Sequence, residues 1–220
     1  VLETHGHWDH IQAVPAMREA GYEVAVTAAD APRLKDVGYD VFIDDAEVIE
    51  VGNLRIHAIH NPGHTEGSIS FAVANTPLLF TGDTLFIGDV GRPDLAAKSH
   101  LTVEDLASHL YDSLRNKIMT LPDEVLVYPA HGAGSACGKN MSKETWDTLG
   151  HQKQTNYALR ADMSKEEFIK EVTDGLLPPP GYFPLNVKMN KEGYDSIDDV
   201  LERGLQALDP DAFEAAANET

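Results

Sequence analysis

The sequence predicts a domain of the α/β class, and three observations lead to that prediction. Short runs of apolar or alternating residues, which are typical of strands, recur between residue 1 and residue 128. Longer segments with apolar residues every three or four positions, which are typical of helices, lie between these runs and after them. Hydrophobic residues make up 42% of the 220 positions, which is enough for the core of one main domain.

The first part of the chain alternates between the two patterns. Ile11, Val14 and Met17 have helical spacing and precede Gly21, which predicts a helix over residues 10–21. Strand patterns occur at residues 1–2, 22–27, 47–51, 54–60, 68–74 and 78–81, and a short helix is predicted at residues 28–37. A Gly-Asn pair separates the third and fourth of these strands, which predicts a tight hairpin between them.

The second part begins with a glycine- and aspartate-rich segment over residues 82–102, which predicts a long loop. Amphipathic or apolar patterns then predict a helix at residues 103–121, a strand at 125–128 and helices at 144–161 and 165–173. The run Pro178-Pro179-Pro180 interrupts these patterns, so we expect an extended segment at 181–193 and helices at 196–208 and 210–217. The change in composition predicts three parts, namely residues 1–175, a proline-rich strap at 176–208, and residues 209–220.

Composition excludes some classes of partner. The formal net charge is -19, and such a surface would repel the phosphates of nucleic acid and the headgroups of an anionic membrane. No apolar run has the length of a membrane span, so we do not expect the chain to be an integral membrane protein. Cys137 is the only cysteine, so an internal disulfide is excluded and a reducing, cytoplasmic location is favoured.

Four groups of side chains that can bind a metal each follow a strand-like run. They are His5, His7, Asp9 and His10 in the first group, then His64, then Asp83, and then His131. Any one of them alone is compatible with a solvated polar turn. Because strand ends gather at one edge of a sheet, where loops carry function, the four groups together predict one metal centre. The remaining histidines lack this setting and are expected to be surface or hydrogen-bonding residues: His57, His60, His100, His109 and His151.

These residues resemble those of the metallo-β-lactamase superfamily. The H-x-H-x-D-H motif of that family corresponds to His5-Gly6-His7-Trp8-Asp9-His10, and its later ligands correspond to His64, Asp83 and His131. The resemblance covers about residues 1–160 and implies an αββα sandwich with the metal at one edge of the sheets. The family's strands that precede the motif are absent before Val1, so we expect residues 1–175 to be an N-terminally truncated catalytic domain and the chain to be a fragment.

The resemblance implies two reactions. In the hydroxyacylglutathione hydrolases (glyoxalase II), two Zn(2+) ions share all seven ligands and activate a water against a thioester. One ion would then be held by His5, His7 and His64, the other by Asp9, His10 and His131, and Asp83 would bridge them. In the persulfide dioxygenases, one Fe(2+) ion would be held by His5, His64 and Asp83, which leaves three coordination positions open. A non-catalytic metal-binding module is a third alternative, which is disfavoured because every ligand position is filled.

The segment after Asp83 favours the dioxygenase. The stretch "TGDTLFIGDVGRPDL" resembles the Gly-Arg-x-Asp element of persulfide dioxygenases, while "GAGSACGKNMS" and "HQKQTNYALR" resemble those of bacterial dioxygenases joined to a rhodanese domain. By contrast, "THGHWDHIQAVPAMREAG" is similar to bacterial glyoxalase II. We therefore predict oxidation of glutathione persulfide by O2 to sulfite, with four catalytic residues: Asp9, His10, Arg92 and Asp94. The last two either brace the loop or orient the metal ligands.

Three further residues are candidates for contact with the substrate, a glutathione persulfide or a related small persulfide. Cys137 lies in a stretch of small residues beyond His131, where it is either a thiol near the substrate or a small buried residue. Tyr157 and Arg160 are candidate glutathione contacts, and ordinary helix surface is the alternative for both. Residues 209–220 resemble the start of a rhodanese-like domain, which implies a fused rhodanese partner, and the sequence is compatible with a homo-oligomer.

Overall fold

The computed structural model describes residues 1–97, 100–205 and 207–218. Contacts between residues divide the chain into two compact units, Val1–Gly181 and Tyr182–Thr220. None of the helices in the described ranges has the length and apolar character that crossing a membrane requires.

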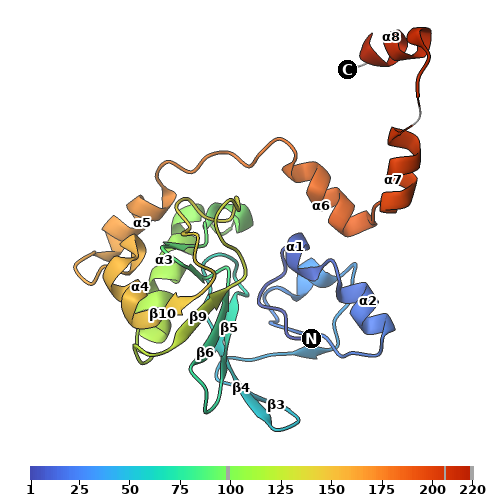
Figure 1. Cartoon of the computed structure of the whole chain (residues 1–220). Helices are drawn as coiled ribbons and strands as arrows, with labels where there is room; N and C mark the ends of the chain where they lie inside the picture. Colours follow the sequence, from blue (N-terminus) through green and yellow to red (C-terminus); the bar gives the residue numbers. More distant parts are fainter. Residues whose placement is uncertain (98–99, 206, 219–220) are drawn as a thin grey trace. The chain divides into compact units, whose positions relative to one another are not determined.

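A mixed six-stranded sheet lies at the centre of the first unit (Figure 1). Its order is β10-β9-β6-β5-β4-β3, with β3 at Val48–Val51, β4 at Leu54–His60, β5 at Ile69–Val73, β6 at Leu78–Gly82, β9 at Leu126–Pro129 and β10 at Asp147–Thr148. Strands β6 and β9 are parallel, and the other neighbours are antiparallel. The predicted hairpin is confirmed between β3 and β4, where Gly52 has a φ of 59°, a conformation that glycine adopts without steric cost.

Helices cover one face of this sheet (Figure 1). They are α3 (Val103–Ser113), which continues into a π-helical turn η3 (Leu114–Ile118), α4 (Leu149–Thr155), the 3-10 turn η4 (Tyr157–Leu159) and α5 (Lys165–Thr173). Thr102 begins α3 with a reciprocal capping box to Asp105. Leu79 and Val127 of the sheet share one buried cluster with Leu110 and Phe168 of these helices. This cluster is the larger core of the unit.

The first 43 residues cover the opposite face of the sheet. Their elements are α1 (Trp8–Ile11), α2 (Val14–Glu19), β1 (Ala25–Val26), the 3-10 turn η1 (Ala31–Leu34) and β2 (Val41–Phe42). Strand β1 pairs in parallel with β2, and Leu2 forms a further parallel bridge to Ala25. Ala25 and Ile43 pack against Ile69 and Phe71 of β5 in a second buried cluster. The first unit therefore has the predicted α/β class.

Three expected elements near the N-terminus are shorter than predicted. The helix expected over residues 10–21 is divided into α1 and α2, because Pro15 lacks the backbone N–H that a continuous helix needs and instead occupies the first turn of α2. The strand expected at 22–27 is reduced to β1. The helix expected at 28–37 is only the 3-10 turn η1, which has Pro32 at its start.

The segment at residues 82–102 is more structured than a loop. It contains the small hairpin of β7 (Leu85–Phe86) and β8 (Asp89–Val90), followed by the 3-10 turn η2 (Asp94–Ala96). Strands of two residues carry no periodic pattern, which is why the sequence did not predict them. The helix expected at 144–161 begins only at α4, since the preceding residues Asp147–Thr148 pair with β9 as β10.

The second unit contains three helices within its described residues. They are α6 (Phe183–Glu192), α7 (Ile197–Gly204) and α8 (Pro210–Asn218). The last two confirm the helices expected at 196–208 and 210–217. The expectation of an extended segment at 181–193 is wrong, because α6 lies there. Pro184 is compatible with that helix because it occupies the first turn, and Gly193, with a φ of 86°, ends the helix.

Candidate metal centre

The topology of the sheet explains why distant ligand residues meet. Strand β4 is antiparallel to β5, β5 is antiparallel to β6, and β6 is parallel to β9. The carboxyl ends of β4, β6 and β9 therefore lie at the same edge. His64 follows β4, Asp83 follows β6 directly, and His131 follows β9. The first motif reaches the same edge from the segment between Leu2 and α1, so the structure brings all seven predicted residues together.

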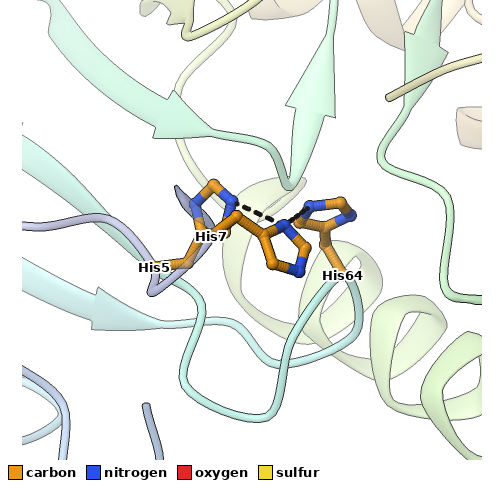
Figure 2. A group of neighbouring side chains, drawn as sticks. All are labelled: His5, His7 and His64. Carbon is orange, nitrogen blue, oxygen red and sulfur yellow. Dashed lines mark hydrogen bonds between the residues drawn. The ribbon is translucent and has the colours of Figure 1, made fainter. Parts of the chain in front are cut away.

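His5, His7 and His64 form a cluster of three imidazole rings (Figure 2). The Nδ1 atom of His7 lies 3.1 Å from Nε2 of His5 and 3.0 Å from Nε2 of His64. Two nitrogens that each lie about 2.1 Å from a shared metal are separated by about 3.0–3.4 Å, depending on the geometry. These spacings fit one metal position, which we call the three-histidine face.

The outer nitrogens of two of these rings have partners that fix the rings' orientation. Nδ1 of His64 donates a hydrogen bond to the carbonyl oxygen of Arg92 at 2.8 Å. Nδ1 of His5 lies 3.2 Å from the hydroxyl of Thr4. When Nδ1 carries the proton in each ring, Nε2 presents a lone pair to the centre, which is the arrangement that metal-binding histidines adopt.

A second face consists of Asp9, His10 and His131. Nε2 of His10 lies 3.1 Å from Nε2 of His131, and Oδ2 of Asp9 lies 3.2 Å from the same atom of His131. Asp9 and His10 come from α1, whereas His131 comes from the loop after β9. These three residues form another group that could hold a metal ion, adjacent to the three-histidine face.

Asp83 lies between the two faces. Its Oδ2 atom is 3.4 Å from Nε2 of His64 and 3.5 Å from Nε2 of His131, and its Oδ1 atom is 3.5 Å from Nε2 of His10. Both oxygens are buried and accept no hydrogen bond from the described residues. A buried carboxylate without donors is strongly destabilising unless a cation compensates its charge. The donor set and the unsatisfied carboxylate therefore fit a bound metal ion.

The two faces differ in their electrostatics. Burial lowers the pKa of His5 and of His7 well below the usual value, and the neighbouring His64 lowers both further. Both rings are therefore neutral near pH 7, the form that binds metals. On the second face, the hydrogen bond to Asp9 and then that to Cys137 raise the pKa of His131 to about 10. Burial alone would raise the pKa of Asp9, but the bond from His131, the charge of His10, a backbone hydrogen bond and the charge of His131 together outweigh burial and lower this pKa to about 2.

Arg92 connects the centre to two other segments. Its guanidinium donates to both carboxylate oxygens of Asp94 at 2.7 and 2.6 Å, and also to the carbonyl oxygens of Ala136 at 3.3 Å and Leu177 at 2.8 Å. Its own carbonyl oxygen accepts the bond from His64. The side chain thus braces the loop together with Asp94, while the backbone carbonyl fixes the ring of His64. A catalytic role of Arg92 and Asp94 stays a prediction.

Cys137 lies beside the centre. Its side chain is buried, with 5% exposed, and its sulfur lies within 4.8 Å of a ligand atom of Asp83 and of His131. The backbone N–H of Arg92 donates to the carbonyl oxygen of Cys137 at 3.0 Å, which fixes this segment next to the Arg92 loop. The thiol of Cys137 is therefore buried and also close to the candidate ligands, so the position is compatible with both interpretations, a small buried residue and a thiol near the substrate.

Tyr157 and Arg160 lie in different surroundings. The hydroxyl of Tyr157 donates to Oδ1 of Asp89 at 2.9 Å, and burial together with this carboxylate raises the pKa of Tyr157 above its usual value. The Arg160 side chain is exposed, with Asp162 3.6 Å away. Contact of either residue with glutathione stays a prediction.

Sequence reasoning missed two buried carboxylates, Asp30 and Asp89. Oδ2 of Asp89 accepts hydrogen bonds from the backbone N–H groups of Lys139 and Asn140 at 2.5 and 2.6 Å, so this residue holds the segment that follows Cys137. Asp30 bonds to the loops that carry the three histidines. The only signal in the sequence is an acidic residue within an apolar or glycine-rich stretch, which is also common in exposed turns.

Glu3 precedes the histidine motif and should make stability depend on pH. Burial raises the pKa of Glu3 to about 7, although the N-terminal amino group opposes the shift. Because this value exceeds that of an unfolded glutamate, about 4.3, stability is lost as the pH rises from about 4.3 to about 7. Glu3→Gln should leave stability nearly unchanged near pH 4 and raise the free energy of unfolding by up to about 3 kcal/mol at pH 8. Urea titrations at the two pH values measure this difference, and equal effects at both would show that Glu3 ionises normally.

Comparisons with known proteins relate the chain to enzymes of two activities. The profile of the Metallo-beta-lactamase superfamily matches residues 1–131. The human protein "Persulfide dioxygenase ETHE1, mitochondrial" is 30% identical over 191 residues, which are 86% of this chain and 66% of that protein. The "Hydroxyacylglutathione hydrolase" of Rhodospirillum rubrum is 35% identical over 132 residues, which are 60% of this chain and 47% of that protein. The chain thus spans just under two thirds of the first relative and about half of the second.

A solved structure is similar over most of the chain. The crystal structure of ETHE1 from Myxococcus xanthus superposes with a TM-score of 0.69 and is 32% identical. The likeness covers 88% of this chain and 77% of that one.

Proposed function

The chain belongs to the metallo-β-lactamase superfamily and has its fold, and from that premise we propose that it is a persulfide dioxygenase that oxidises glutathione persulfide with O2 to sulfite at one Fe(2+) ion. Its relatives include enzymes named as dioxygenases and as hydrolases, and both names refer to sulfur compounds or glutathione derivatives. The superfamily therefore supports a metal-dependent enzyme, and the choice of reaction is the proposal.

The length of the matched sequence supports the choice of a dioxygenase over a hydrolase. The match to the human persulfide dioxygenase covers 86% of the chain, whereas the match to the Rhodospirillum rubrum hydrolase covers 60%. The hydrolase is more identical within its shorter match, which agrees with the glyoxalase-like sequence at the N-terminus. The longer similarity to the dioxygenase requires agreement over most of the chain, including residues outside the metal ligands that both activities share.

In the proposed enzyme, His5, His64 and Asp83 would hold the iron. Fe(2+) on two imidazoles and one carboxylate would supply open coordination positions and a redox-active ion for chemistry with oxygen. Of the three residues, Asp83 supports this assignment most strongly, because its buried carboxylate has no donor among the described residues. His7, with Nδ1 pointing to the same position, completes the imidazole cluster.

Residues of the second face would act on the substrate. The hydrogen bond to Asp9 raises the pKa of His131, and a protonated ring beside Asp83 would attract an anionic persulfide. Asp9 would orient this ring through its 3.2 Å contact with Nε2 of His131, and His10 borders the same space. The thiol of Cys137 lies beside both His131 and Asp83, at the position where a sulfur substrate would meet the centre.

The overall reaction balances with one water molecule. The bond between the two sulfur atoms of the persulfide breaks, and the inner sulfur leaves as the thiol of glutathione. The outer sulfur combines with the oxygen atoms of O2 and of water to give sulfite and two protons. The persulfide loses four electrons in this process, which reduce one O2. Holding both reactants at one centre replaces a bimolecular encounter with a positioned one.

The dinuclear hydrolase is the second candidate, and one observation favours it. The carboxylate of Asp83 lies near histidines of both faces, with Oδ2 close to His64 and His131 and Oδ1 close to His10, as a residue shared by two ions would require. Two Zn(2+) ions would then be held by the two faces and would activate a water against a glutathione thioester. This arrangement uses Asp9, His10 and His131 as direct ligands.

The proposal also includes partners that rest on the sequence resemblance. Glutathione persulfide or a related small persulfide is the substrate, and residues 209–220 begin a fused rhodanese-like domain that would exchange sulfane sulfur with glutathione. Residues 1–175 are the catalytic domain and residues 176–208 the connecting segment. We place the enzyme in the reducing environment of the cytoplasm.

Two assays on one preparation test the proposed reaction. The protein in its natural length is purified without air, and its iron and zinc contents are measured. Oxygen uptake with glutathione persulfide is then compared with hydrolysis of a glutathione thioester. The proposal expects about one iron per chain, oxygen uptake and release of sulfite. Rapid thioester hydrolysis with two zinc ions per chain and no oxygen uptake would establish the hydrolase instead.

A further inference from the structure

Asp30 joins the two loops that carry the three-histidine face. Its side chain is buried, with 1% of the residue exposed. One oxygen, Oδ2, accepts a hydrogen bond from the backbone N–H of Gly6 at 2.8 Å and another from the hydroxyl of Thr65 at 2.8 Å. Gly6 lies between His5 and His7, and Thr65 directly follows His64. A single carboxylate oxygen therefore connects the backbone on both sides of this face.

Packing around Asp30 leaves little room for the two loops to move. A Cβ atom on Gly6 would lie 2.7 Å from Cβ of Arg33, and a Cβ atom on Gly67 would lie 2.7 Å from Cγ of Asp30. The hydroxyl of Thr27 donates to the carbonyl oxygen of Gly67 at 2.8 Å. The segment from Thr27 to η1 thus packs directly against both loops, at two positions where only glycine fits.

The residues around Asp30 hold its carboxylate group in one orientation. Nε of Arg33 lies 3.3 Å from Oδ1 and supplies a counter-charge to the carboxylate. The hydroxyl of Thr65 also lies 2.9 Å from that of Ser68, whose oxygen accepts the backbone N–H of Thr65. Among the described residues, no hydrogen bond or ion pair joins Asp30 to Asp9, His10 or His131.

We propose that Asp30 is a positioning residue that sets the separation of the loop of His5 and His7 from the loop of His64, and thereby the metal affinity of the three-histidine face. This inference rests on the proposed metal centre, but not on which reaction that centre performs. A shift of either loop would move one Nε2 atom relative to the other two nitrogens and so weaken the binding of one ion. Residues that contact ligands rather than the metal commonly change metal affinity by about 10- to 100-fold when they are replaced.

The test compares Asp30→Ala, Asp30→Asn and a matched control, Asp40→Ala. Asp40 lies in the same part of the fold, accepts a backbone N–H from Val24 at 2.9 Å and pairs with Arg18, but it contacts neither loop. Affinity for Fe(2+) alone and for Zn(2+) alone is measured by competition with a chelator, on protein whose folded fraction is checked by circular dichroism. The nitric oxide complex of bound Fe(2+) gives an electron paramagnetic resonance spectrum that reports ligand geometry.

Asp30→Ala is expected to weaken binding of either metal by about 10- to 100-fold and to broaden the nitrosyl spectrum. Asp30→Asn keeps an oxygen that can accept both bonds, so it should restore affinity to within about fivefold of the wild type. Asp40→Ala should lower stability but change metal affinity by less than about twofold. If Asp30→Ala does not fold, Thr65→Val removes one of the two bonds with little change in shape and should weaken binding by a smaller factor.

Two outcomes would overturn the inference. One is an Asp30→Ala protein that binds metal as tightly as the Asp40→Ala control. The other is an Asp30→Asn protein that binds as weakly as Asp30→Ala, because the charge and not the two hydrogen bonds would then be responsible. Failure of the proposed reaction can be told apart from failure of this inference. If the wild-type protein shows no oxygen uptake, the zinc affinities of the wild type and the variants can still be compared, and they test the role of Asp30 alone.

Discussion

Asp83→Ala is expected to abolish metal binding and catalytic activity together. Asp83 is the one candidate ligand that faces His64, His131 and His10, and its buried oxygens have no hydrogen-bond donor among the described residues. Removing the carboxylate takes the buried negative charge between the two faces from the centre, so a divalent ion loses both a ligand and part of its charge compensation. Metal analysis after dialysis should give less than about a tenth of an ion per chain, with activity at background.

The stability of the metal-free proteins shows whether this loss is local. Without metal, Asp83 is a buried carboxylate that the fold does not compensate with a donor, so the metal-free variant should be at least as stable as the metal-free wild type. Added metal should raise the melting temperature of the wild type only, because only a folded state that binds the ion gains free energy from it. A variant that keeps its metal, or one that unfolds without it while the metal-free wild type stays folded, would contradict this role.

His10→Ala and His64→Ala should separate the one-metal centre from the two-metal centre. His64 belongs to the three-histidine face and is oriented by the carbonyl of Arg92, so its loss should abolish activity in either case. His10 belongs to the second face. In a dioxygenase it borders the substrate, and we expect its removal to lower oxygen uptake by about 10- to 100-fold while iron stays bound.

In a two-zinc hydrolase the same substitution removes a direct ligand. The metal content of His10→Ala should then fall from two ions per chain to one, and thioester hydrolysis should fall to background. Metal content and both activities are therefore measured on the same three proteins. An iron content that falls together with oxygen uptake in His10→Ala would show that His10 holds the iron, and would contradict the ligand set of His5, His64 and Asp83.

Part of the centre was predictable because His64, Asp83 and His131 each follow a strand. The sheet order makes β4, β6 and β9 end at one edge, so the residues after them meet whatever the lengths of the intervening loops. Periodicity also identified the hairpin at Gly52 and the helix α5 at its observed bounds, since both are long enough to show a pattern.

Other elements were not predictable because their causes are tertiary. The strands β7 and β8 have two residues each, so burial of Leu85 and Val90 in the larger core, rather than any local pattern, defines them. Helix α6 follows three prolines, a pattern that favours extended structure, although Pro184 can begin a helix. The roles of Asp30 and Asp89 depend on bonds to residues far away in the sequence, which no local motif records.

The candidate ligands come from separate loops, so the complete metal site can form only after the chain has folded. An unfolded chain offers a metal only the local cluster of His5, His7, Asp9 and His10, because His64, Asp83 and His131 arrive through the pairing of β4, β5, β6 and β9. The complete set of donors exists only after the sheet has formed, in contrast to small zinc modules whose ligands lie close together in the sequence. We therefore expect the identity of the bound ion to depend on the metals that the folded protein encounters, so that expression of the same chain in iron-rich or zinc-rich medium should yield different holoproteins.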